Sequence, residues 1–369
     1  MRYIISGGGT GGHIYPAIAI AKAVEKIDAD AEILFVGAEN RMEMEKVPQA
    51  SYKIIGLPVA GFSRSNIFSN FKVGLLLLKS LRKAKKIIQE FNPDVAVGVG
   101  GYASGPVLKK AQKYGVPTIL QEQNSYAGVT NKLLAKNAKA ICVAYENMDK
   151  FFPAERIILT GNPLRESIKS YKTLSKKSAK NTLGFNCDRK LVVAIGGSLG
   201  ARTINESIKA ALPSIIENGA DVLWQTGKRF FEEYQAISEN YSSDRVKIVP
   251  YIENMETVYA AADIIISRAG ASTISEIQYI GKPAVLIPSP NVAEDHQRKN
   301  AESLSSIQAA VTLLDKDAVS QMPEIITELI KNEDKLRMMS ENVKKLSKPD
   351  ADVEIAHIIF EIAQRNSKQ

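Results

Sequence analysis

The sequence predicts an α/β fold made of two Rossmann-like halves, each built around a parallel β-sheet. Three observations predict it. Short β-branched or apolar runs alternate with helical patterns along the chain, a polar break divides this alternation near the middle, and glycine-rich turns join strands to helices in both halves. At 369 residues the chain is also longer than one typical core, which favours two domains.

The first half contains six expected strands, each a short apolar run followed by a turn and a helical pattern. They lie at residues 3–6, 33–37, 94–98, 118–121, 140–143 and 157–160. The segment 161–185 is polar and basic and opens on an Asn-Pro pair, which indicates a linker.

The same alternation restarts after this break. Its apolar runs lie at residues 191–197, 220–226, 246–250, 262–268, 283–289 and 309–313. A helical pattern at 353–363 ends the series, and the sequence leaves its role open.

Three glycine-rich turns indicate where a ligand binds. They are GGGTGGHIYP (7–16), GGSLGAR (196–202) and SRAGASTISE (267–276), each between an apolar run and a helical pattern. Helix starts present free N–H groups and a partial positive charge that attract phosphate, and open parallel sheets bind ligands at the carboxyl ends of their strands. We therefore expect a phosphate-containing ligand in a cleft between the halves, with Ser272, Thr273 and Ser275 capping a helix.

Other nucleotide-binding classes are less well supported. Gly7, Gly9 and Gly12 satisfy G-x-G-x-x-G, but the nearest ribose-binding acid, Glu39, comes late for a dehydrogenase. The chain has no G-K-[ST], which argues against a P-loop NTPase.

Charge and cysteine usage bound the partners and the compartment. The net charge is +8, but the aromatic residues near the basic run 64–86 form no RNA-binding signature, so we expect no nucleic-acid partner. Cys142 and Cys187 match neither a disulfide framework nor a zinc site. With no signal-peptide pattern and no apolar run of about 20 residues, the protein is expected to remain in the cytoplasm.

The pattern at 72–88 predicts a helix with one apolar and one basic side. The apolar side holds Val73, Leu77, Leu81, Ala84 and Ile88, widened by Leu75, Leu76 and Leu78, and the basic side holds Lys72, Lys79, Lys83 and Lys86. Two interpretations remain open: a core helix with a solvated basic face, or attachment to an anionic inner membrane leaflet.

Four further motifs accompany the three glycine-rich turns: GVGGYASGP (98–106), QEQNSYAG (121–128), GNPLR (161–165) and PSPNVAEDHQRKNA (288–301). With these motifs, the chain resembles the MurG family of bacterial N-acetylglucosaminyltransferases, in glycosyltransferase family 28. The resemblance implies a GT-B fold, with two Rossmann-like domains whose parallel sheets face across a cleft. It places an acceptor and membrane-associated domain at 1–162 and a UDP-GlcNAc-binding domain at 163–345, with a C-terminal helix in 346–369 packing back on the first domain.

The resemblance also implies a donor site. The donor UDP-GlcNAc would be bound by Thr10, Gly11, Gly12, Asn124, Arg165, Ser198, Ile252, Ala271, Ser272, Thr273, Glu276 and Gln297. Arg165 is implied to contact the diphosphate, Glu276 the ribose hydroxyls and the Ile252 backbone the uracil. Gln297 is implied to bind the sugar hydroxyls.

On the acceptor side the resemblance implies Gly101, Tyr102 and Ser104, with His13 as the catalytic residue, either as general base or by positioning the acceptor. The implied reaction is an inverting transfer of GlcNAc to the C4 hydroxyl of MurNAc in lipid I, which yields lipid II for peptidoglycan synthesis. No metal or other cofactor is expected, and the three D-x-D patterns are discounted. Many family members have His where this chain has Gln121, so no role of that histidine is transferred.

The implied partners are UDP-GlcNAc, lipid I, the anionic leaflet at the cytoplasmic face of the inner membrane, and a cell-wall synthesis complex. Alternatives are a UDP-sugar 2-epimerase or another GT-B transferase, an NAD-dependent dehydrogenase, and a noncatalytic sugar-nucleotide binder. The acceptor-side motif GYASGP argues against the epimerase and against another GT-B transferase.

Overall fold

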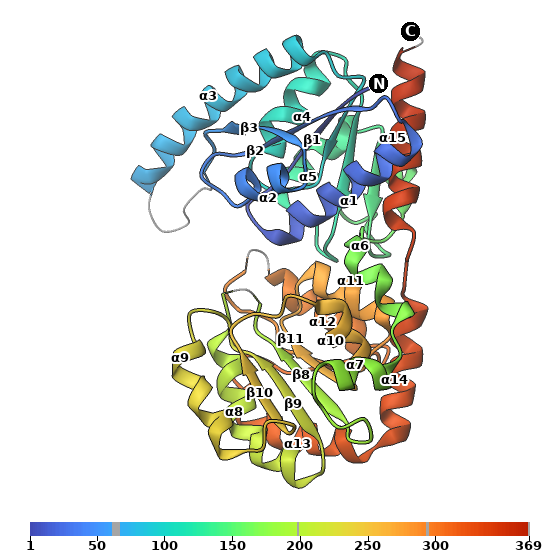
Figure 1. The fold of residues 1–369 in the computed structure, drawn as a ribbon. Coiled ribbons are helices and arrows are strands. Elements are labelled where there is room, and N and C mark those ends of the chain that lie inside the picture. Colours follow the sequence, from blue (N-terminus) through green and yellow to red (C-terminus); the bar gives the residue numbers. More distant parts are fainter. Residues whose placement is uncertain (61–66, 198, 293–294, 368–369) are drawn as a thin grey trace. The chain divides into compact units, whose positions relative to one another are not determined.

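The computed structural model describes residues 1–60, 67–197, 199–292 and 295–367. The chain divides into two compact units: unit 1 comprises Met1–Arg165 and Pro349–Gln369, and unit 2 comprises Glu166–Lys348 (Figure 1). Each unit has its own parallel sheet and its own core, as the alternation of strands and helices predicts.

Unit 1 is built on a sheet of order β3-β2-β1-β4-β5-β6-β7 within the described residues. Its strands are β1 (Arg2–Ser6), β2 (Glu32–Ala38), β3 (Lys53–Leu57), β4 (Val95–Gly98), β5 (Thr118–Glu122), β6 (Ala140–Val143) and β7 (Ile157–Leu159). Its helices are α1 (Gly11–Ile27), α2 (Glu43–Gln49), α3 (Ile67–Phe91), α4 (Ser104–Lys113), α5 (Val129–Leu134) and α15 (Ala351–Ser367), with 3-10 turns η1 (Ala135–Asn137) and η2 (Ala154–Arg156).

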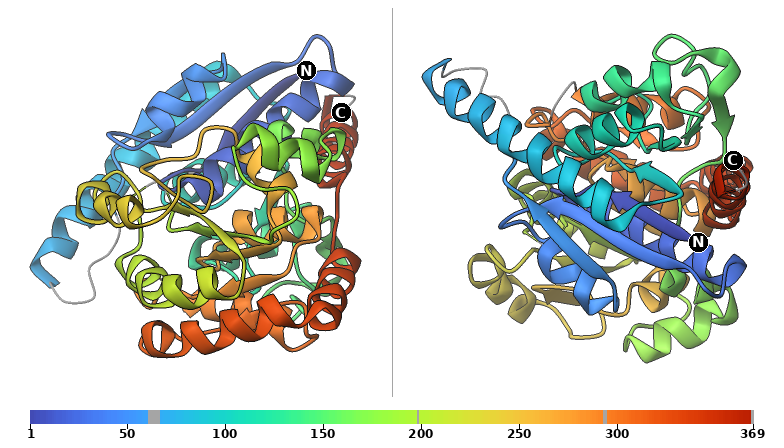
Figure 2. Two further views of the ribbon diagram at one scale, coloured as in Figure 1. Left: turned by 60° about the horizontal axis from the view of Figure 1, so that its bottom comes forward. Right: turned by 90° about the horizontal axis from the view of Figure 1, so that it is seen from above.

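Alternation along the strands of unit 1 supplies two cores, one on each face of the sheet. In β1, Tyr3 and Ile5 point to one face, where α1 and α15 pack, and Ile4 points to the other, where α3 and α4 pack. The helices cover both faces, as a parallel sheet requires (Figures 1 and 2).

The last helix of the chain, α15, belongs to unit 1. Its residues Ile355 and Ile359 are fully buried against α1 and the sheet, and each contributes about 1.5–3 kcal/mol by burial. The Asn366 side chain donates to the Asp94 carbonyl at 3.1 Å. The polypeptide therefore crosses between the units twice, after Arg165 and again before Pro349.

Unit 2 is built on a sheet of order β10-β9-β8-β11-β12-β13 within the described residues. Its strands are β8 (Leu191–Ile195), β9 (Asp221–Gln225), β10 (Val246–Val249), β11 (Ile264–Ser267), β12 (Ala284–Leu286) and β13 (Val311–Thr312). Its helices are α6 (Glu166–Lys169), α7 (Lys176–Thr182), α8 (Arg202–Glu217), α9 (Phe231–Tyr234), α10 (Met255–Ala261), α11 (Ala271–Ile280), α12 (His296–Ser305), α13 (Ala318–Lys331) and α14 (Glu333–Lys345), with η3 (Ser170–Thr173) and η4 (Gln235–Asn240).

The expected strands are confirmed, with two differences in organisation. Strand β3 was not predicted: it is a five-residue edge strand that contains Lys53 and Gly56 and follows the short helix α2. The expected linker at 161–185 is wrong in part, because α6, η3 and α7 occupy it. One lysine of this segment, Lys180, lies in the interior of unit 2 and is 2% exposed. Its burial is tolerated because its ammonium group pairs with the Asp263 carboxylate at 2.9 Å.

Helix α3 also differs from its expected pattern. Val73, Ala84 and Ile88 are buried as predicted, but Leu77 is 39% exposed. Ser80 is buried instead, and its hydroxyl donates to the Pro58 carbonyl at 2.8 Å. The helix therefore turns a polar residue with a bonding partner inward and leaves leucines at its surface.

Candidate functional site

Each sheet has a topological switch point at the carboxyl ends of two central strands. In unit 1, the chain continues from β1 to β2 on one side of it in the sheet, and β4 lies on the other side of β1. In unit 2, the chain continues from β8 to β9 on one side, and β11 lies on the other side of β8. Ligands of open parallel sheets bind at such points. The glycine-rich turns after β1, β8 and β11 all lie there.

In unit 1, the turn after β1 packs directly on the turn after β4. A Cβ on Gly7 would lie 2.2 Å from Cγ2 of Val99, and one on Gly101, whose φ is +86°, would lie 2.4 Å from the Gly8 carbonyl oxygen. Glycine is therefore required at Gly101 by the close approach of the Gly8 backbone and at Gly7 by the packing of the Val99 side chain. This contact brings the implied acceptor turn to the first glycine loop.

His13 lies at the junction of these two turns. Its Nδ1 is 3.2 Å from Oγ1 of Thr10, and a Cβ on Gly100 would come within 2.9 Å of the imidazole. Thr10 is the N-cap residue of α1 but makes no side-chain capping bond, so Gly11 and Gly12 begin a helix whose first amides are uncapped. Thr10, Gly11, Gly12 and His13 thus form one group at the start of α1.

The implied acceptor residues have different exposures. Tyr102 is 57% exposed. Ser104 is fully buried, and its hydroxyl donates to the Gly101 carbonyl at 3.0 Å. Ser104 therefore stabilises the turn in this structure, whereas Tyr102 presents its side chain to solvent.

The segment after β5 is held by a buried carboxylate, Glu122, which was not among the predicted site residues. Oε1 of Glu122 accepts from the amide and side chain of Asn124 at 3.1 and 3.3 Å, and Oε2 accepts from Gly128 and Asn131, both at 2.9 Å. Burial raises the pKa of Glu122, opposed by these four bonds. Asn124, an implied donor contact, is thereby tethered to Glu122.

Gln121 lies inside this edge of unit 1. It is fully buried, and its Nε2 donates to Oδ1 of Asn162 at 2.9 Å, while Nδ2 of Asn162 donates to the Gln123 carbonyl at 3.0 Å. Through its bond to Asn162, Gln121 thus holds the segment that leads to Arg165 against the end of β5. The Arg165 guanidinium lies over the Tyr15 ring at 5.4 Å, which places it beside the first turns of α1.

In unit 2, helix α11 begins without a side-chain cap, and the expected capping by its hydroxyls is wrong. Its N-cap residue is Gly270, and Oγ of Ser275 donates to the Ala271 carbonyl at 3.0 Å. Ala271, Ser272 and Thr273 form the first turn. Oγ of Ser272 is buried with no hydrogen-bond partner among the described residues. An uncapped helix start with an unsatisfied hydroxyl suits an anionic ligand.

Glu276 lies one turn further along α11 and is 5% exposed. The hydroxyl of Tyr259, on α10, donates to its Oε2 at 2.8 Å. A buried carboxylate held in one orientation is suited to accept from a pair of hydroxyl groups. Tyr259 gave no signal in the sequence.

The Ile252 backbone is held by a residue of the neighbouring strand. Its N–H donates to Oε1 of Gln225 at 2.9 Å, and Nε2 of Gln225 donates to the Gly197 carbonyl at 2.9 Å. Gln225 therefore joins the turn after β8 to the segment after β10. Its position as the polar last residue of an apolar strand was the available sequence signal. Ser198 lies outside the described residues.

Gln297 lies near the carboxyl ends of β12 and β13. Its Oε1 accepts from the Ser289 amide at 2.9 Å. Ser289 lines a pocket of about 460 Å³ whose other lining residues are Pro288, Pro290, Asp295, Arg298, Leu314, Asp315 and Lys316. This part of unit 2 therefore has a cavity with polar side chains in its wall, next to Gln297.

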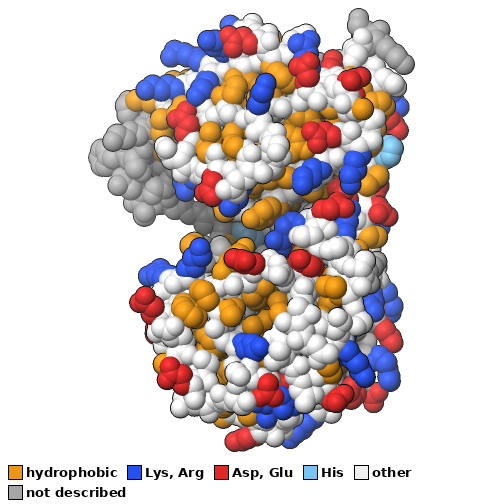
Figure 3. Space-filling model, viewed as in Figure 1, with side chains coloured by type: hydrophobic (Ala, Val, Ile, Leu, Met, Phe, Trp, Pro, Cys, Tyr) orange, Lys and Arg blue, Asp and Glu red, His pale blue; other side chains and the backbone are white. Residues whose placement is uncertain are grey.

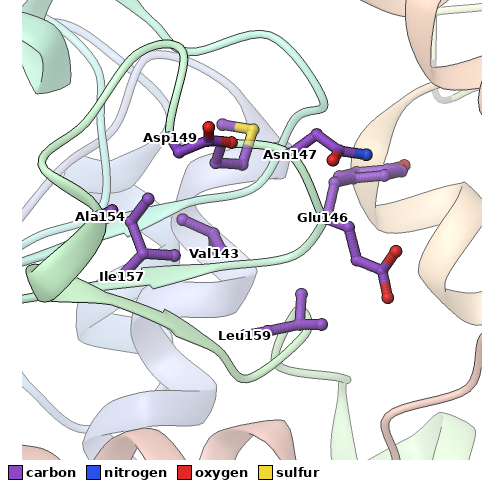
Figure 4. Close-up of a pocket in the computed structure, with 9 residues that line it drawn as sticks. Val143, Glu146, Asn147, Asp149, Ala154, Ile157 and Leu159 are labelled. Atoms are coloured by element: carbon purple, nitrogen blue, oxygen red, sulfur yellow. The ribbon is translucent and has the colours of Figure 1, made fainter.

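A second pocket, of about 300 Å³, lies beside β6 and β7 in unit 1. Figure 4 shows residues that line it, among them the apolar Val143, Ile157 and Leu159 and the acidic Glu146 and Asp149. None of the implied site residues lines it. It is therefore separate from the glycine turns.

The first aspartate of two of the three D-x-D patterns makes contacts within the fold. Asp28 precedes β2, at the amino edge of its sheet, and accepts from the N-terminal amine at 3.0 Å. Asp315 pairs with Arg268 and accepts from Thr203. Among the described side chains, no group of three or more His, Cys, Asp or Glu could hold a metal ion. In the same part of the chain, no helix is long and apolar enough to cross a membrane.

Two Rossmann-like units with glycine turns at both switch points define the class of proteins that bind nucleotides at the carboxyl edge of a parallel sheet. The models of the glycosyltransferase family 28 N-terminal and C-terminal domains match residues 3–143 and 191–355. The chain belongs to glycosyltransferase family 28.

Curated relatives agree over the whole chain. A Bacteroides fragilis protein is 51% identical over 99% of this chain and 97% of its own length, and a Parabacteroides distasonis protein is 52% identical over 99% of each. Both are named UDP-N-acetylglucosamine--N-acetylmuramyl-(pentapeptide) pyrophosphoryl-undecaprenol N-acetylglucosamine transferase.

Solved structures agree with the fold. The chain is similar to Acinetobacter baumannii MurG, with 27% identity, a TM-score of 0.80, and coverage of 98% of this chain and 99% of that one. A UDP co-structure of Staphylococcus aureus MnaA has a TM-score of 0.67 at 16% identity, covering 98% of this chain and 97% of that one, and shows the same fold. The GT-B fold is thereby confirmed.

Proposed function

We propose that the protein is an inverting glycosyltransferase that moves GlcNAc from UDP-GlcNAc to the C4 hydroxyl of MurNAc in lipid I and so makes lipid II. The uncapped start of α11, with Glu276 one turn along, is the observation that carries the proposal. It combines an anion site and a buried carboxylate on one helix. The names of the full-length relatives specify the same donor and acceptor chemistry.

The donor nucleotide is proposed to bind unit 2. The first amides of α11 and the Ser272 hydroxyl face the phosphates, after rotation of Ser272 about χ1 to its partly exposed side. Glu276 accepts from the ribose hydroxyls. Because the Ile252 N–H is bonded to Gln225, its carbonyl is the group that accepts from the N3–H of uracil. Gln297 is proposed to bind the sugar hydroxyls.

The acceptor is proposed to bind the paired turns of unit 1. His13 either removes the proton from the attacking hydroxyl or orients it, with Thr10 3.2 Å from Nδ1. As the bond from C1 to the diphosphate breaks, negative charge grows on UDP. The amides of α11 and the Arg165 guanidinium are proposed to stabilise this charge. That the reaction needs no metal or other cofactor remains a prediction.

Unit 1 is proposed to attach to the anionic cytoplasmic face of the inner membrane through α3. Leu75, Leu77 and Leu78 are 48%, 39% and 54% exposed. Basic side chains gather over this helix on the face shown in Figure 3. Exposed leucines beside lysines suit an interface in which apolar groups insert and cations bind lipid phosphate. Docking to a cell-wall synthesis complex is a further proposal.

The decisive experiment measures UDP release from UDP-GlcNAc with and without a lipid I analogue. Release that requires the acceptor, with the disaccharide formed, supports the proposal. Acceptor-independent epimerisation, hydride transfer to a nicotinamide cofactor, or binding without turnover would each contradict it in favour of the corresponding alternative.

Variants test the assignment of roles within this reaction. Glu276→Ala is expected to raise the KM for UDP-GlcNAc, because Glu276 contacts the ribose equally in the ground state and the transition state. Arg165→Ala is expected to raise the KM and also to lower kcat, because its contact with the diphosphate strengthens as charge grows there. His13→Ala is expected to lower kcat mainly. Unchanged kinetics in all three variants would remove the site assignment.

A further inference from the structure

A buried carboxylate in unit 1 contacts the first glycine turn and has none of the roles assigned above. Glu43, at the start of α2, is 1% exposed. Its Oε2 accepts from the Gly9 amide at 3.0 Å, and its Oε1 accepts from the Ala38 amide at 2.9 Å. One side chain thus joins the turn after β1 to the end of β2.

Two glycines make room for this side chain. A Cβ on Gly8 would lie 2.1 Å from Oε1 of Glu43, and one on Gly37 would lie 2.6 Å from its Cγ. Real Cβ atoms do not approach other atoms this closely. Gly8 also has φ +147°, but Gly37 lies in β2 without a left-handed φ. Its closest neighbour is Glu43, and Cδ1 of Ile54 would lie further away, at 3.1 Å, so Glu43 is the main reason for glycine there.

The position of Glu43 has a consequence for His13. On its other side, the same turn is blocked by the turn after β4, because a Cβ on Gly101 would meet the Gly8 carbonyl at 2.4 Å. The turn is therefore clamped between Glu43 and residues 99–101. Holding the Gly9 amide restricts where Thr10 and the start of α1 can lie, and His13 is in the first turn of that helix.

We propose that Glu43 is a positioning residue for the transfer reaction: it holds Gly9 so that the start of α1 and His13 have the geometry that the acceptor requires. This inference rests on the proposed function. Glu43 cannot touch substrate, because it is buried and backbone amides occupy both of its oxygens. Charge-assisted bonds to amides are strong enough to hold such a turn.

Two variants displace this contact by different means. Glu43→Gln keeps the size and shape of the side chain. It replaces one carboxylate oxygen by an NH2 group, which cannot accept a hydrogen bond from the Gly9 or the Ala38 amide. Gly37→Ala leaves every loop residue and Glu43 itself in the sequence, but its Cβ pushes on Cγ of Glu43. We expect each to lower kcat by about 10- to 100-fold, the range for small misplacements of reacting groups. Kd for uridine, whose proposed contacts Ile252 and Glu276 both lie in unit 2, is expected to stay within about twofold of wild type. Hydrogen exchange of the Gly9 amide is expected to accelerate in both.

Gly56→Ala is the matched control. Gly56 pairs with Gly37 across β3 and β2, and its Cβ would meet Cγ of Glu39 at 2.7 Å. Since the Glu39 side chain is 40% exposed, it can move away, and both kcat and exchange at Gly9 are expected to stay close to wild type.

Several outcomes would overturn the inference. One is a folded Glu43→Gln or Gly37→Ala protein with kcat within about twofold of wild type. Another is a parallel loss of uridine affinity, which would show a general structural defect that reaches unit 2. Unchanged exchange at Gly9 would refute the contact even if the wild-type protein proved to have no transferase activity, so failure of the proposed function and failure of this inference are distinguishable.

Discussion

The bond from Tyr259 to Glu276 provides a sharp test of the proposed ribose site. Tyr259→Phe removes only the hydroxyl that donates to Oε2 at 2.8 Å, in a position that is 1% exposed. The ring remains, so packing in unit 2 is preserved. Glu276 is left with one hydrogen bond fewer to define its orientation.

The size of the effect follows from the kind of bond that is lost. A hydrogen bond to a charged group contributes about 1.5–3 kcal/mol, which corresponds to about 10- to 150-fold in an equilibrium constant. Part of this is lost from the stability of unit 2 and part from binding. We therefore expect Kd for UDP to rise about tenfold.

A ligand series identifies which part of UDP is affected. Isothermal titration with uridine and with UDP should show the same fold-loss for Tyr259→Phe, because both ligands carry the ribose. Ser272→Ala, which alters the proposed phosphate site, should weaken UDP and leave uridine unchanged. Tyr52→Phe is the control, since it removes a comparable bond, from Tyr52 to Glu25 at 2.7 Å, in unit 1.

Two results would refute this reasoning. If Tyr259→Phe bound UDP within twofold of wild type, Glu276 would not need Tyr259 to bind the nucleotide. If UDP were weakened and uridine were not, the carboxylate would act on the phosphate side, contrary to a ribose contact.

The remaining predictions concern stability and membrane binding. Burial, together with neighbouring lysines, lowers the pKa of Lys282 from 10.5 to about 8. The unfolded state thus binds more protons between these values, so stability should rise with pH, by about 1 kcal/mol from pH 7 to pH 9. Lys282→Met should flatten this rise in urea unfolding followed by Trp224, the single tryptophan and a buried residue of unit 2, while Lys209→Met should keep it. For the membrane, Lys79/Lys83/Lys86→Glu should weaken binding to vesicles rich in anionic lipid by about 100-fold or more, at ~1 kcal/mol per lysine. Lys209/Lys331/Lys345→Glu in unit 2 carries the same charge change, and equal binding by both variants and wild type would remove the role of α3.

Sequence patterns were sufficient for the parts of the fold that depend on local periodicity. Buried parallel strands such as β1 and β11 are continuous apolar runs bounded by turns, so they stand out in the sequence. The edge strand β3 does not, because it is short, half-exposed and interrupted by glycine. The helices within 161–185 were missed for a similar reason: their lysines suggest solvent, and only Asp263, far along the chain, explains why Lys180 is inside.

The sequence by itself determined the alternating α/β fold, its two halves and the glycine turns, because strand and helix periods and clusters of glycine can be read from neighbouring residues. Only the tertiary structure decided which side chains hold those turns. Glu43, Gln225 and Tyr259 act on Gly9, Ile252 and Glu276 through contacts between different elements. Such contacts depend on strand order and helix packing, which bring distant residues together, and no local pattern records them.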